Sequence, residues 1–382
     1  MKISILTQPL GHNYGGLLQA YALQTHLRAR GHDVETLDRR KRETSKKSVV
    51  KAYIRNSVRY ALGRIKSIPT RKREAFVYQK LADFRDRQLR MSQRIDSEAT
   101  LRDYYRQHPV DAVIVGSDQV WRPIYSPSLT NFFLDFLDDV EAAGQPSARR
   151  ISYAASFGVD DWEFSAEQTD ICRALIKKFD AVSVREQSAQ LLCQEHLGVD
   201  AEWVVDPTLL LEAADYESLI PAGSSAQKGK ILTYVLDPAE DKQAIAGNVA
   251  GILQKGLFSV KPQKTLTEVT ADQQQQCQYP GVGEWLQGFR DAAFVVTDSF
   301  HGCVFAIIFN KPFIAVGNAK RGLSRFHSLL QIFGLEDRLI SDQQQVTPEL
   351  VAAAIDWDKV NRIRQNKARE AQAFLARHLP AI

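Results

Sequence analysis

Short apolar runs alternate with stretches of helical periodicity along the first half of the chain. An apolar run predicts a strand, and apolar residues that recur every three or four positions predict a helix. Each predicted strand ends in a polar or glycine-containing loop, and each helix leads to the next strand. The expected strands are 2–8, 33–38, 110–118, 150–158, 180–186 and 201–207, and the expected helices are 13–31, 74–90, 97–107, 166–179 and 187–198. This alternation indicates a doubly wound α/β domain.

The second half shows the same alternation after a polar segment. Residues 219–230 combine Pro, Gly, Ser and Lys between two periodic regions, which is typical of a linker. Beyond it we expect strands 231–237, 257–260, 293–298 and 312–318, helices 239–255, 282–292 and 303–310, and a long helix or helix pair at the end. The sequence therefore predicts two Rossmann-like domains that face each other across a cleft. Ligands of such sheets bind at the carboxyl ends of the strands.

The composition is that of an ordinary folded protein. The 382 residues are 44% apolar and 25% charged, and no apolar run reaches the ~20 residues that span a bilayer. The N-terminus lacks the pattern of a secretory signal. The four cysteines lack the spacing of a metal site or a disulfide framework: Cys172, Cys193, Cys277 and Cys303. We therefore expect a cytoplasmic protein with neither a metal site nor a cofactor.

Positive charge is concentrated in one segment, which we expect to be a helical insertion. Residues 39–73 hold fourteen Lys or Arg and one acidic residue, so the segment carries +13 and the rest of the chain −9. Apolar residues recur within it at helical spacing, with Lys51, Arg55 and Arg59 on a neighbouring line. The apolar residues form one stripe along the expected helix: Val50, Ile54, Val58, Ala61, Ile65 and Ile68.

Three interpretations of the basic segment are open. It is a surface helix whose stripe packs on its own domain, or an amphipathic helix whose residues 46–68 lie on an anionic membrane, such as the inner face of the plasma membrane. The third is a nucleic-acid contact, but no nucleic-acid-binding motif surrounds the segment, so we expect no nucleic acid.

A histidine follows the strand expected at 293–298. The sequence runs from Asp298 and Ser299 to His301 and Gly302, where a helix starts. A helix start offers N–H groups and a positive dipole that suit phosphate or carboxylate, and glycine lets a ligand approach the backbone. A histidine there can donate a proton near neutral pH. Alternatively, Asp298 or Ser299 only caps the helix and His301 fills a polar niche.

The sequence GSDQVW, residues 116–121, ends another predicted strand in the same way. Asp118 and Gln119 suit sugar hydroxyls, and Asp118 is also a candidate base for a hydroxyl nucleophile. Trp121 offers a flat apolar face on which a sugar ring can stack. The alternative is a tight turn followed by a core tryptophan.

Cations cluster after two further strands. Arg185 stands at a strand end, where its planar guanidinium suits a carboxylate or phosphate, although an ion pair with a neighbour such as Glu186 also explains it. Lys320, Arg321 and Arg325 follow the strand at 312–318. Together they indicate an anionic ligand, and a solvated loop is the alternative.

Residues 13–19, NYGGLLQ, form a glycine turn before a helix. The turn lacks the Gly-x-Gly-x-x-Gly spacing, which argues against a dinucleotide. The residues Asn13, Tyr14 and Gly15 leave room for an acceptor, and a purely structural turn explains them equally well.

Six blocks of the sequence together resemble the polysaccharide pyruvyl transferase family. They occur in the family's order between residue 3 and about residue 338. The blocks are NYGGLLQAYALQTHLRARGHDVETLD, VIVGSDQVWRP, ISYAASFG, AVSVREQSAQLLCQEHLGV, VVDPTLLL and TDSFHGCVFAIIFNKPFIAVGN. The family is similar in fold to GT-B glycosyltransferases, in which a C-terminal helix often crosses back. The resemblance implies an acceptor domain 1–218, a donor domain 219–350 and a crossing helix 351–382.

The resemblance also implies an activity. Members transfer the enolpyruvyl unit of phosphoenolpyruvate to sugar hydroxyls of an exopolysaccharide, a capsule or a lipid-linked precursor, and form a pyruvate ketal. His301 matches the functional histidine, as acid or phosphate ligand, and Arg185 matches a donor-binding arginine. We expect the donor to contact Ser299, Gly302, Lys320, Arg321 and Arg325 as well, and the acceptor to contact Asn13, Tyr14, Gly15, Gln119 and Trp121, with Asp118 as the base.

One departure concerns Ser299, because some members carry an arginine two residues before the histidine. Arg321 or Arg325 would then have to supply that charge, or the donor binds differently. Two other functions remain open: a metal-independent glycosyltransferase that uses a nucleotide sugar, and a non-catalytic glycan-binding or scaffold protein at the membrane surface.

Overall fold

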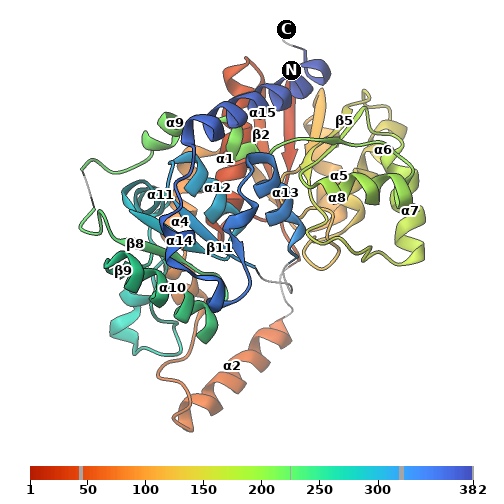
Figure 1. Ribbon diagram of the computed structural model, residues 1–382. Coiled ribbons are helices and arrows are strands. Elements are labelled where there is room, and N and C mark those ends of the chain that lie inside the picture. Colours follow the sequence, from red (N-terminus) through yellow and green to blue (C-terminus); the bar gives the residue numbers. More distant parts are fainter. Residues whose placement is uncertain (43–45, 224, 318–321, 381–382) are drawn as a thin grey trace.

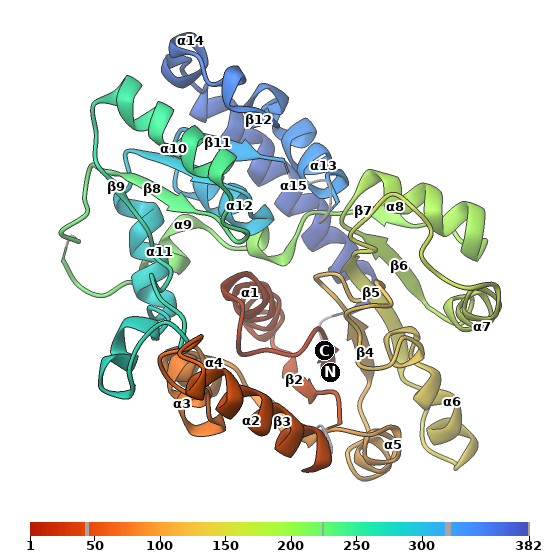
Figure 2. The same cartoon turned by 90° about the horizontal axis from the view of Figure 1, so that it is seen from below.

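The computed structural model describes residues 1–42, 46–223, 225–317 and 322–380, and in it the chain folds around two parallel sheets (Figures 1 and 2). The first sheet has seven strands in the order β3-β2-β1-β4-β5-β6-β7. The strands are β1 (Lys2–Leu6), β2 (Asp33–Arg39), β3 (Met91–Ile95), β4 (Ala112–Val115), β5 (Arg149–Ala155), β6 (Ala181–Val184) and β7 (Glu202–Trp203). All four residues of β4 are buried, because helices cover a parallel sheet on both faces.

The helices of this half connect the parallel strands. They are α1 (Tyr14–Ala29), α2 (Lys46–Ala61), α3 (Arg71–Val77), α4 (Gln79–Gln88), α5 (Glu98–Gln107), α6 (Asp135–Ala142), α7 (Ala166–Ile176), α8 (Gln187–Leu192) and α9 (Ala213–Glu217). A π-helical turn, Cys193–Leu197, extends α8, and the 3-10 turns Thr130–Phe133 and Pro207–Leu210 precede α6 and α9. The doubly wound architecture expected from the alternating pattern is therefore present.

The second sheet has five parallel strands in the order β12-β11-β10-β8-β9. They are β8 (Ile231–Tyr234), β9 (Leu257–Phe258), β10 (Phe294–Thr297), β11 (Phe313–Val316) and β12 (Leu339–Ile340). The accompanying helices are α10 (Glu240–Leu253), α11 (Val282–Asp291), α12 (Phe300–Ile308), α13 (Ser324–Phe333), α14 (Pro348–Ala352) and α15 (Trp357–His378), with 3-10 turns at Ala271–Cys277, Glu336–Arg338 and Gln343–Gln345.

The two halves share one apolar core. Figure 2 shows α1 between the sheets, and its buried residues belong to the same cluster as those of α12. The Tyr14 ring stacks on Trp285 at 5.2 Å, and its hydroxyl donates to the Pro280 carbonyl at 2.7 Å. These contacts hold the start of α1 against the second half.

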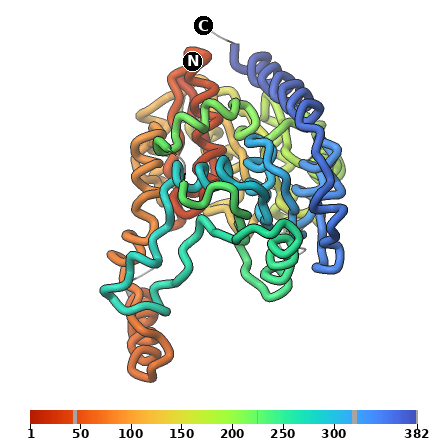
Figure 3. The backbone as a smooth tube through the Cα atoms, turned by 60° about the vertical axis from the view of Figure 1, so that its left-hand side comes forward, coloured from red at the N-terminus to blue at the C-terminus, as the bar shows by residue number. Residues whose placement is uncertain are grey.

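Helix α15 returns to the first half of the chain, as Figure 3 shows for the dark blue segment. Arg377 pairs with Glu202 at 2.7 Å, Arg364 pairs with Glu212, and Arg149 donates to the His378 carbonyl at 3.0 Å. Of the helices that the structure describes, none is both long and apolar enough to cross a membrane.

Two sequence predictions need correction. Strand β3 was not expected, because its sequence MSQRI is mostly polar and only Ile95 is buried, as suits an edge strand. The helical stripe of the basic segment ends at Ala61 rather than continuing to Ile68, and Ile65 is buried beyond the helix. The stripe also does not pack on its own domain, since Val50 and Ile54 are 55% and 56% exposed.

Candidate functional site

A small cavity lies where strand-end loops of both halves meet. It encloses about 70 Å³, and both halves of the chain contribute to it. The lining residues are Asn13, Asp118, Gln119, Tyr125, Leu236, Asp298, Ser299, Phe300, His301 and Arg325. The carboxyl ends of β1, β4 and β10 each deliver part of this set, as expected for ligand sites of open parallel sheets.

His301 lies in the first turn of α12 and is buried. Ser299 caps this helix, because its hydroxyl accepts from the Gly302 N–H at 3.3 Å. A Cβ on Gly302 would lie 2.2 Å from Thr297 Oγ1, so this glycine is needed for packing against the strand end. Gly302 is not among the residues that line the cavity, and its contact with the donor stays a prediction, while Ser299 both caps the helix and lines the cavity.

The imidazole of His301 is held between the two halves. A Cβ on Gly15 would lie 2.1 Å from His301 Nδ1, so the ring occupies the space that the glycine leaves open. On its other side, Nε2 lies 3.7 Å from Asp206 Oδ2. Nε2 is buried and has no hydrogen-bond partner within the described part of the chain.

Asp206 is the functional residue that the sequence analysis did not single out. It is 1% exposed, and it accepts from Arg185 Nη1 at 2.8 Å and from the Ser117 hydroxyl at 3.2 Å. Burial raises the pKa of Asp206, but the charges of His301 and Arg185 outweigh burial and hold the pKa well below its ordinary value. Asp206 is therefore a buried anion beside the imidazole of His301. Its signals in the sequence are its place near the end of the strand expected at 201–207 and its position in the block VVDPTLLL.

Arg185 is wholly enclosed by acids rather than open to solvent. Its Nε donates to Glu186 at 3.0 Å and its Nη1 to Asp206, while Nη2 lies 3.8 Å from Asp118 and has no hydrogen-bond partner among the described residues. Burial lowers the pKa of Arg185, and the three carboxylates raise it further than burial lowers it. The ion pair with Glu186 that the sequence left open is therefore present, and binding of the donor by the remaining Nη2 edge stays a prediction.

Arg325 is the cation that lines the cavity. It lies on α13 and is 8% exposed. Burial and the nearby charge of Arg185 lower its pKa to about 10, so the side chain is still positive at neutral pH. The other two predicted cations, Lys320 and Arg321, lie outside the described residues.

Asp118 and Asp298 both line the cavity but face different partners. Asp118 has a φ of 73°, a conformation that few residues other than glycine adopt, and its carboxylate points toward Arg185. Asp298 accepts from the N–H groups of Leu236 and Asp237 and from Lys242 at 2.6 Å. Asp298 therefore fixes the loop after β8, whereas Asp118 is the better placed base.

The predicted acceptor residues separate into two groups. Asn13 and Gln119 line the cavity, and Asn13 also caps α1 by accepting from the Gly15 N–H at 2.9 Å. Gly15 touches His301 instead, and the Tyr14 side chain is buried between the halves. The assignment of Tyr14 to the acceptor is therefore corrected.

The assignment of Trp121 as a stacking face for a sugar also requires correction. Its side chain is wholly buried, its Nε1 donates to the Phe132 carbonyl at 2.9 Å, and its ring stacks on Phe133. No sugar can stack on it there. Tyr125, four residues later, lines the cavity and is 42% exposed, so it is the aromatic side chain available to a ligand.

No group of three or more His, Cys, Asp or Glu among the described residues is placed to hold a metal ion.

The architecture is similar to that of several solved enzymes that act on nucleotide sugars or transfer sugars, according to their names. The putative UDP-N-acetylglucosamine 2-epimerase of Listeria monocytogenes superposes with a TM-score of 0.53 at 10% identity, over 99% of this chain and 97% of that one. Arabidopsis thaliana UGT89C1, solved with UDP-L-rhamnose, gives 0.52 at 11% over 98% of both chains. A glycosyltransferase of Rickettsia africae gives 0.50 at 9% over 99% and 94%. The fold is therefore GT-B-like.

Within this class, the sequence itself indicates the family. The sequence pattern of the polysaccharide pyruvyl transferases matches residues 13–320. The chain belongs to the polysaccharide pyruvyl transferase family. The matched region contains the His301 and Arg185 loops together with Asp206. No curated protein matches the chain significantly.

Proposed function

We propose that the chain transfers the enolpyruvyl unit of phosphoenolpyruvate to hydroxyl groups of a sugar and forms a pyruvate ketal. The observation that carries this proposal is the pair of His301 and Asp206 beside a cavity that Arg325 lines. Histidine is the side chain most often used for general acid catalysis, and the contact with Asp206 holds the imidazole at the wall of the cavity. A cation beside it suits a donor that carries a phosphate and a carboxylate.

The proposed reaction begins with a proton from His301 to the methylene carbon of the donor, which leaves an oxocarbenium-like centre at C2. A sugar hydroxyl attacks C2 and gives its proton to Asp118. The bond between C2 and the phosphate oxygen then breaks, phosphate leaves, and a second hydroxyl closes the ketal. Of the two hydroxyl protons, one replaces the proton that His301 gave and one leaves with phosphate or solvent.

We assign the donor to the side of the cavity formed by Ser299, His301 and Arg325, with Nη2 of Arg185 as a further contact. Lys320 and Arg321 remain proposed donor ligands. The acceptor is assigned to Asn13, Gln119 and Tyr125, of which only Tyr125 exposes a large apolar face. The proposed acceptor residues all lie in the proposed acceptor domain 1–218, and the donor side combines residues of the proposed donor domain 219–350 with Arg185 of the first domain.

We also propose that the protein works in the cytoplasm, on a sugar of a cell-surface polysaccharide or its precursor. The four cysteines are all free and buried, as suits a reducing compartment. The reaction as written needs no metal ion and no cofactor beyond the donor.

The test is a comparison of ligands by thermal unfolding, followed by a phosphate-release assay with sugar acceptors. A donor at a hundredfold excess over its Kd stabilises a protein by about 2.7 kcal/mol, so binding is visible as a rise in Tm. We expect phosphoenolpyruvate to raise the Tm of the wild-type protein and nucleotide sugars to leave it unchanged. His301→Ala should keep part of the shift but lose phosphate release.

Two outcomes would contradict the proposal. A shift with nucleotide sugars alone would indicate a glycosyltransferase on the same fold. A shift with glycans alone, without phosphate release, would indicate a non-catalytic glycan-binding protein.

A further inference from the structure

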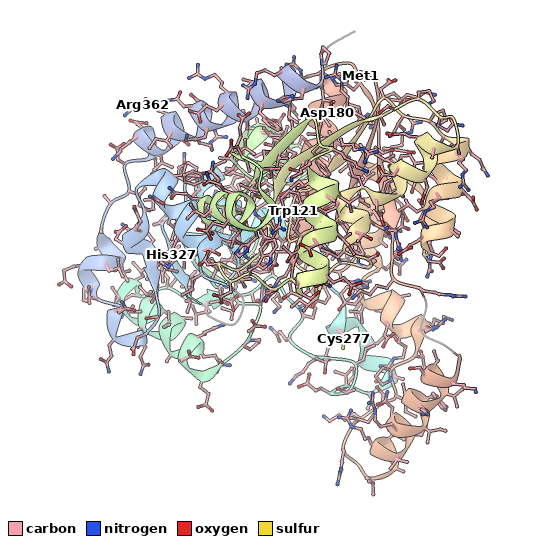
Figure 4. All side chains as sticks on the ribbon, turned by 90° about the vertical axis from the view of Figure 1, so that its right-hand side faces the viewer. Met1, Trp121, Asp180, Cys277, His327 and Arg362 are labelled. Atoms are coloured by element: carbon pink, nitrogen blue, oxygen red, sulfur yellow. The ribbon has the colours of Figure 1, made fainter. Side chains whose placement is uncertain are left out.

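Helix α2 stands apart from the rest of the molecule. Figures 1, 3 and 4 show it extending away from the body that both sheets form. The part of the apolar stripe that lies on α2 faces solvent, since Val50, Ile54 and Val58 are 53–56% exposed. Tyr53, Tyr60 and, just beyond the helix, Leu62 add further exposed apolar side chains. A stripe of this kind normally covers a core, and a contiguous apolar patch on a surface marks an interaction site.

The charge of the segment restricts its partner. Residues 46–68 contain seven Lys or Arg and no Asp or Glu. Lys51, Arg55 and Arg59 follow one another at intervals of four, so they form a basic line beside the stripe. A second copy of this helix would bring like charges together, and nucleic acid would not use the apolar side chains. An anionic lipid surface matches both the apolar stripe and the basic line, because it has an apolar interior beneath negatively charged headgroups.

The segment that follows α2 is hydrogen-bonded to the second half of the chain. The Lys66 N–H donates to the Thr267 carbonyl at 2.8 Å, and the Ser67 hydroxyl donates to the carbonyls of Leu266 and Val269 at 2.7 and 2.8 Å. Arg73 donates in turn to the Ser67 hydroxyl at 2.6 Å. The chain that follows α2 is therefore tied to the body within five residues of the end of the helix.

The parallel strands of the first sheet place the start of the basic segment at the same sheet edge as the cavity. Strand β2 is parallel to β1, which is parallel to β4. The carboxyl ends of these strands share one edge, where β1 leads to Asn13, β4 leads to Asp118, and β2 leads to the basic segment. A surface bound by α2 would thus lie beside the edge that carries the cavity.

We propose that α2 docks the protein on an anionic lipid surface, with its stripe among the acyl chains and its basic line at the headgroups. Docking itself does not depend on the reaction. If the proposed pyruvyl transfer also holds, the docked site faces a membrane, and the acceptor class is a sugar carried on a membrane lipid.

The test is sedimentation of the full chain with vesicles of equal parts phosphatidylglycerol and phosphatidylcholine, compared with pure phosphatidylcholine. We expect binding only to the anionic vesicles, weakened by salt. Replacing Lys51, Arg55 and Arg59 by Gln should lower partitioning roughly a hundredfold, since each basic residue near an anionic surface contributes about a factor of five. Replacing Ile54 and Val58 by Ser should lower it at least about tenfold.

Matched controls are available on other exposed helices. Replacing Lys359, Arg362 and Arg369 on α15 by Gln removes the same charge, and Ile171→Ser with Leu191→Ser removes apolar side chains of similar exposure. These variants should bind as the wild type does. Both α2 variants should keep the wild-type Tm and its shift with phosphoenolpyruvate, which separates loss of docking from loss of folding or of the site.

Three results would overturn the proposal. The first is that the wild-type protein stays entirely in the supernatant with anionic vesicles. The second is that the α2 variants bind as well as the controls. The third is that the two α2 variants abolish a dimer seen by light scattering while vesicle binding is unchanged, which would assign the stripe to a second copy.

Discussion

The contact between Gly15 and His301 gives the sharpest prediction about the site. A Cβ on Gly15 would lie 2.1, 2.4 and 2.7 Å from three atoms of the imidazole. Carbon atoms pack at about 3.5 Å from their neighbours, so in Gly15→Ala the ring must withdraw by more than about 1 Å. Displacing a reacting group by this distance costs about a hundredfold in rate, and the crowding itself costs roughly 1–3 kcal/mol of stability.

The next residue supplies the control. A Cβ on Gly16 would meet its nearest neighbours at 3.8–3.9 Å, which is ordinary contact, so Gly16→Ala should fold and react like the wild type. Phosphate release and urea unfolding measure the two effects. In Gly15→Ala combined with His301→Ala the crowding disappears, so stability should recover while activity does not. Full activity of Gly15→Ala would refute the placement of His301 as the acid.

The remaining predictions concern four other side chains. Asp206→Asn should lower phosphate release and cost roughly 3 kcal/mol of stability, because it leaves the buried charge of Arg185 less compensated. Since the pKa of Asp206 is lowered in the folded protein, its carboxylate stabilises the fold above about pH 4 and this contribution is lost as the pH falls further. Urea unfolding at neutral and acidic pH should therefore show that the free energy of unfolding falls less between the two pH values for Asp206→Asn than for the wild type. Tyr125→Ala should raise the acceptor KM about tenfold with stability changed by less than about 0.5 kcal/mol, whereas Trp121→Ala should cost about 3–5 kcal/mol. Arg325→Gln should remove most of the Tm shift caused by phosphoenolpyruvate, as titration with the donor would show.

Much of the fold follows from local patterns. The central strand β4 is a continuous apolar run, AVIV, and β10 is apolar except for its last residue, Thr297, in FVVT; every residue of both strands is buried. Such runs are visible in a single sequence because helices cover both faces of a central strand. Strand β3 lies at the edge of its sheet and is mostly polar, so no local signal separates it from a loop.

The site is less visible in the sequence because its contacts are long-range. Asp206 accepts from Arg185, 21 residues earlier, and faces His301, 95 residues later. No spacing rule connects such positions. Trp121 and Tyr125 illustrate the same limit, since both follow β4 on one loop and both are aromatic. Only the packing of the Trp121 ring on Phe133 decides which of the two lies in the core.

The serine at position 299 raises the question of which side chain supplies positive charge to the cavity. Ser299 is the N-cap of α12, and its hydroxyl is engaged by the Gly302 N–H. Arg325 enters the same cavity from α13, the next helix along the chain. A cation delivered from α13 leaves the cap of α12 intact and still faces His301 across the cavity. We therefore infer that Arg325, rather than residue 299, supplies the positive charge of the proposed donor site.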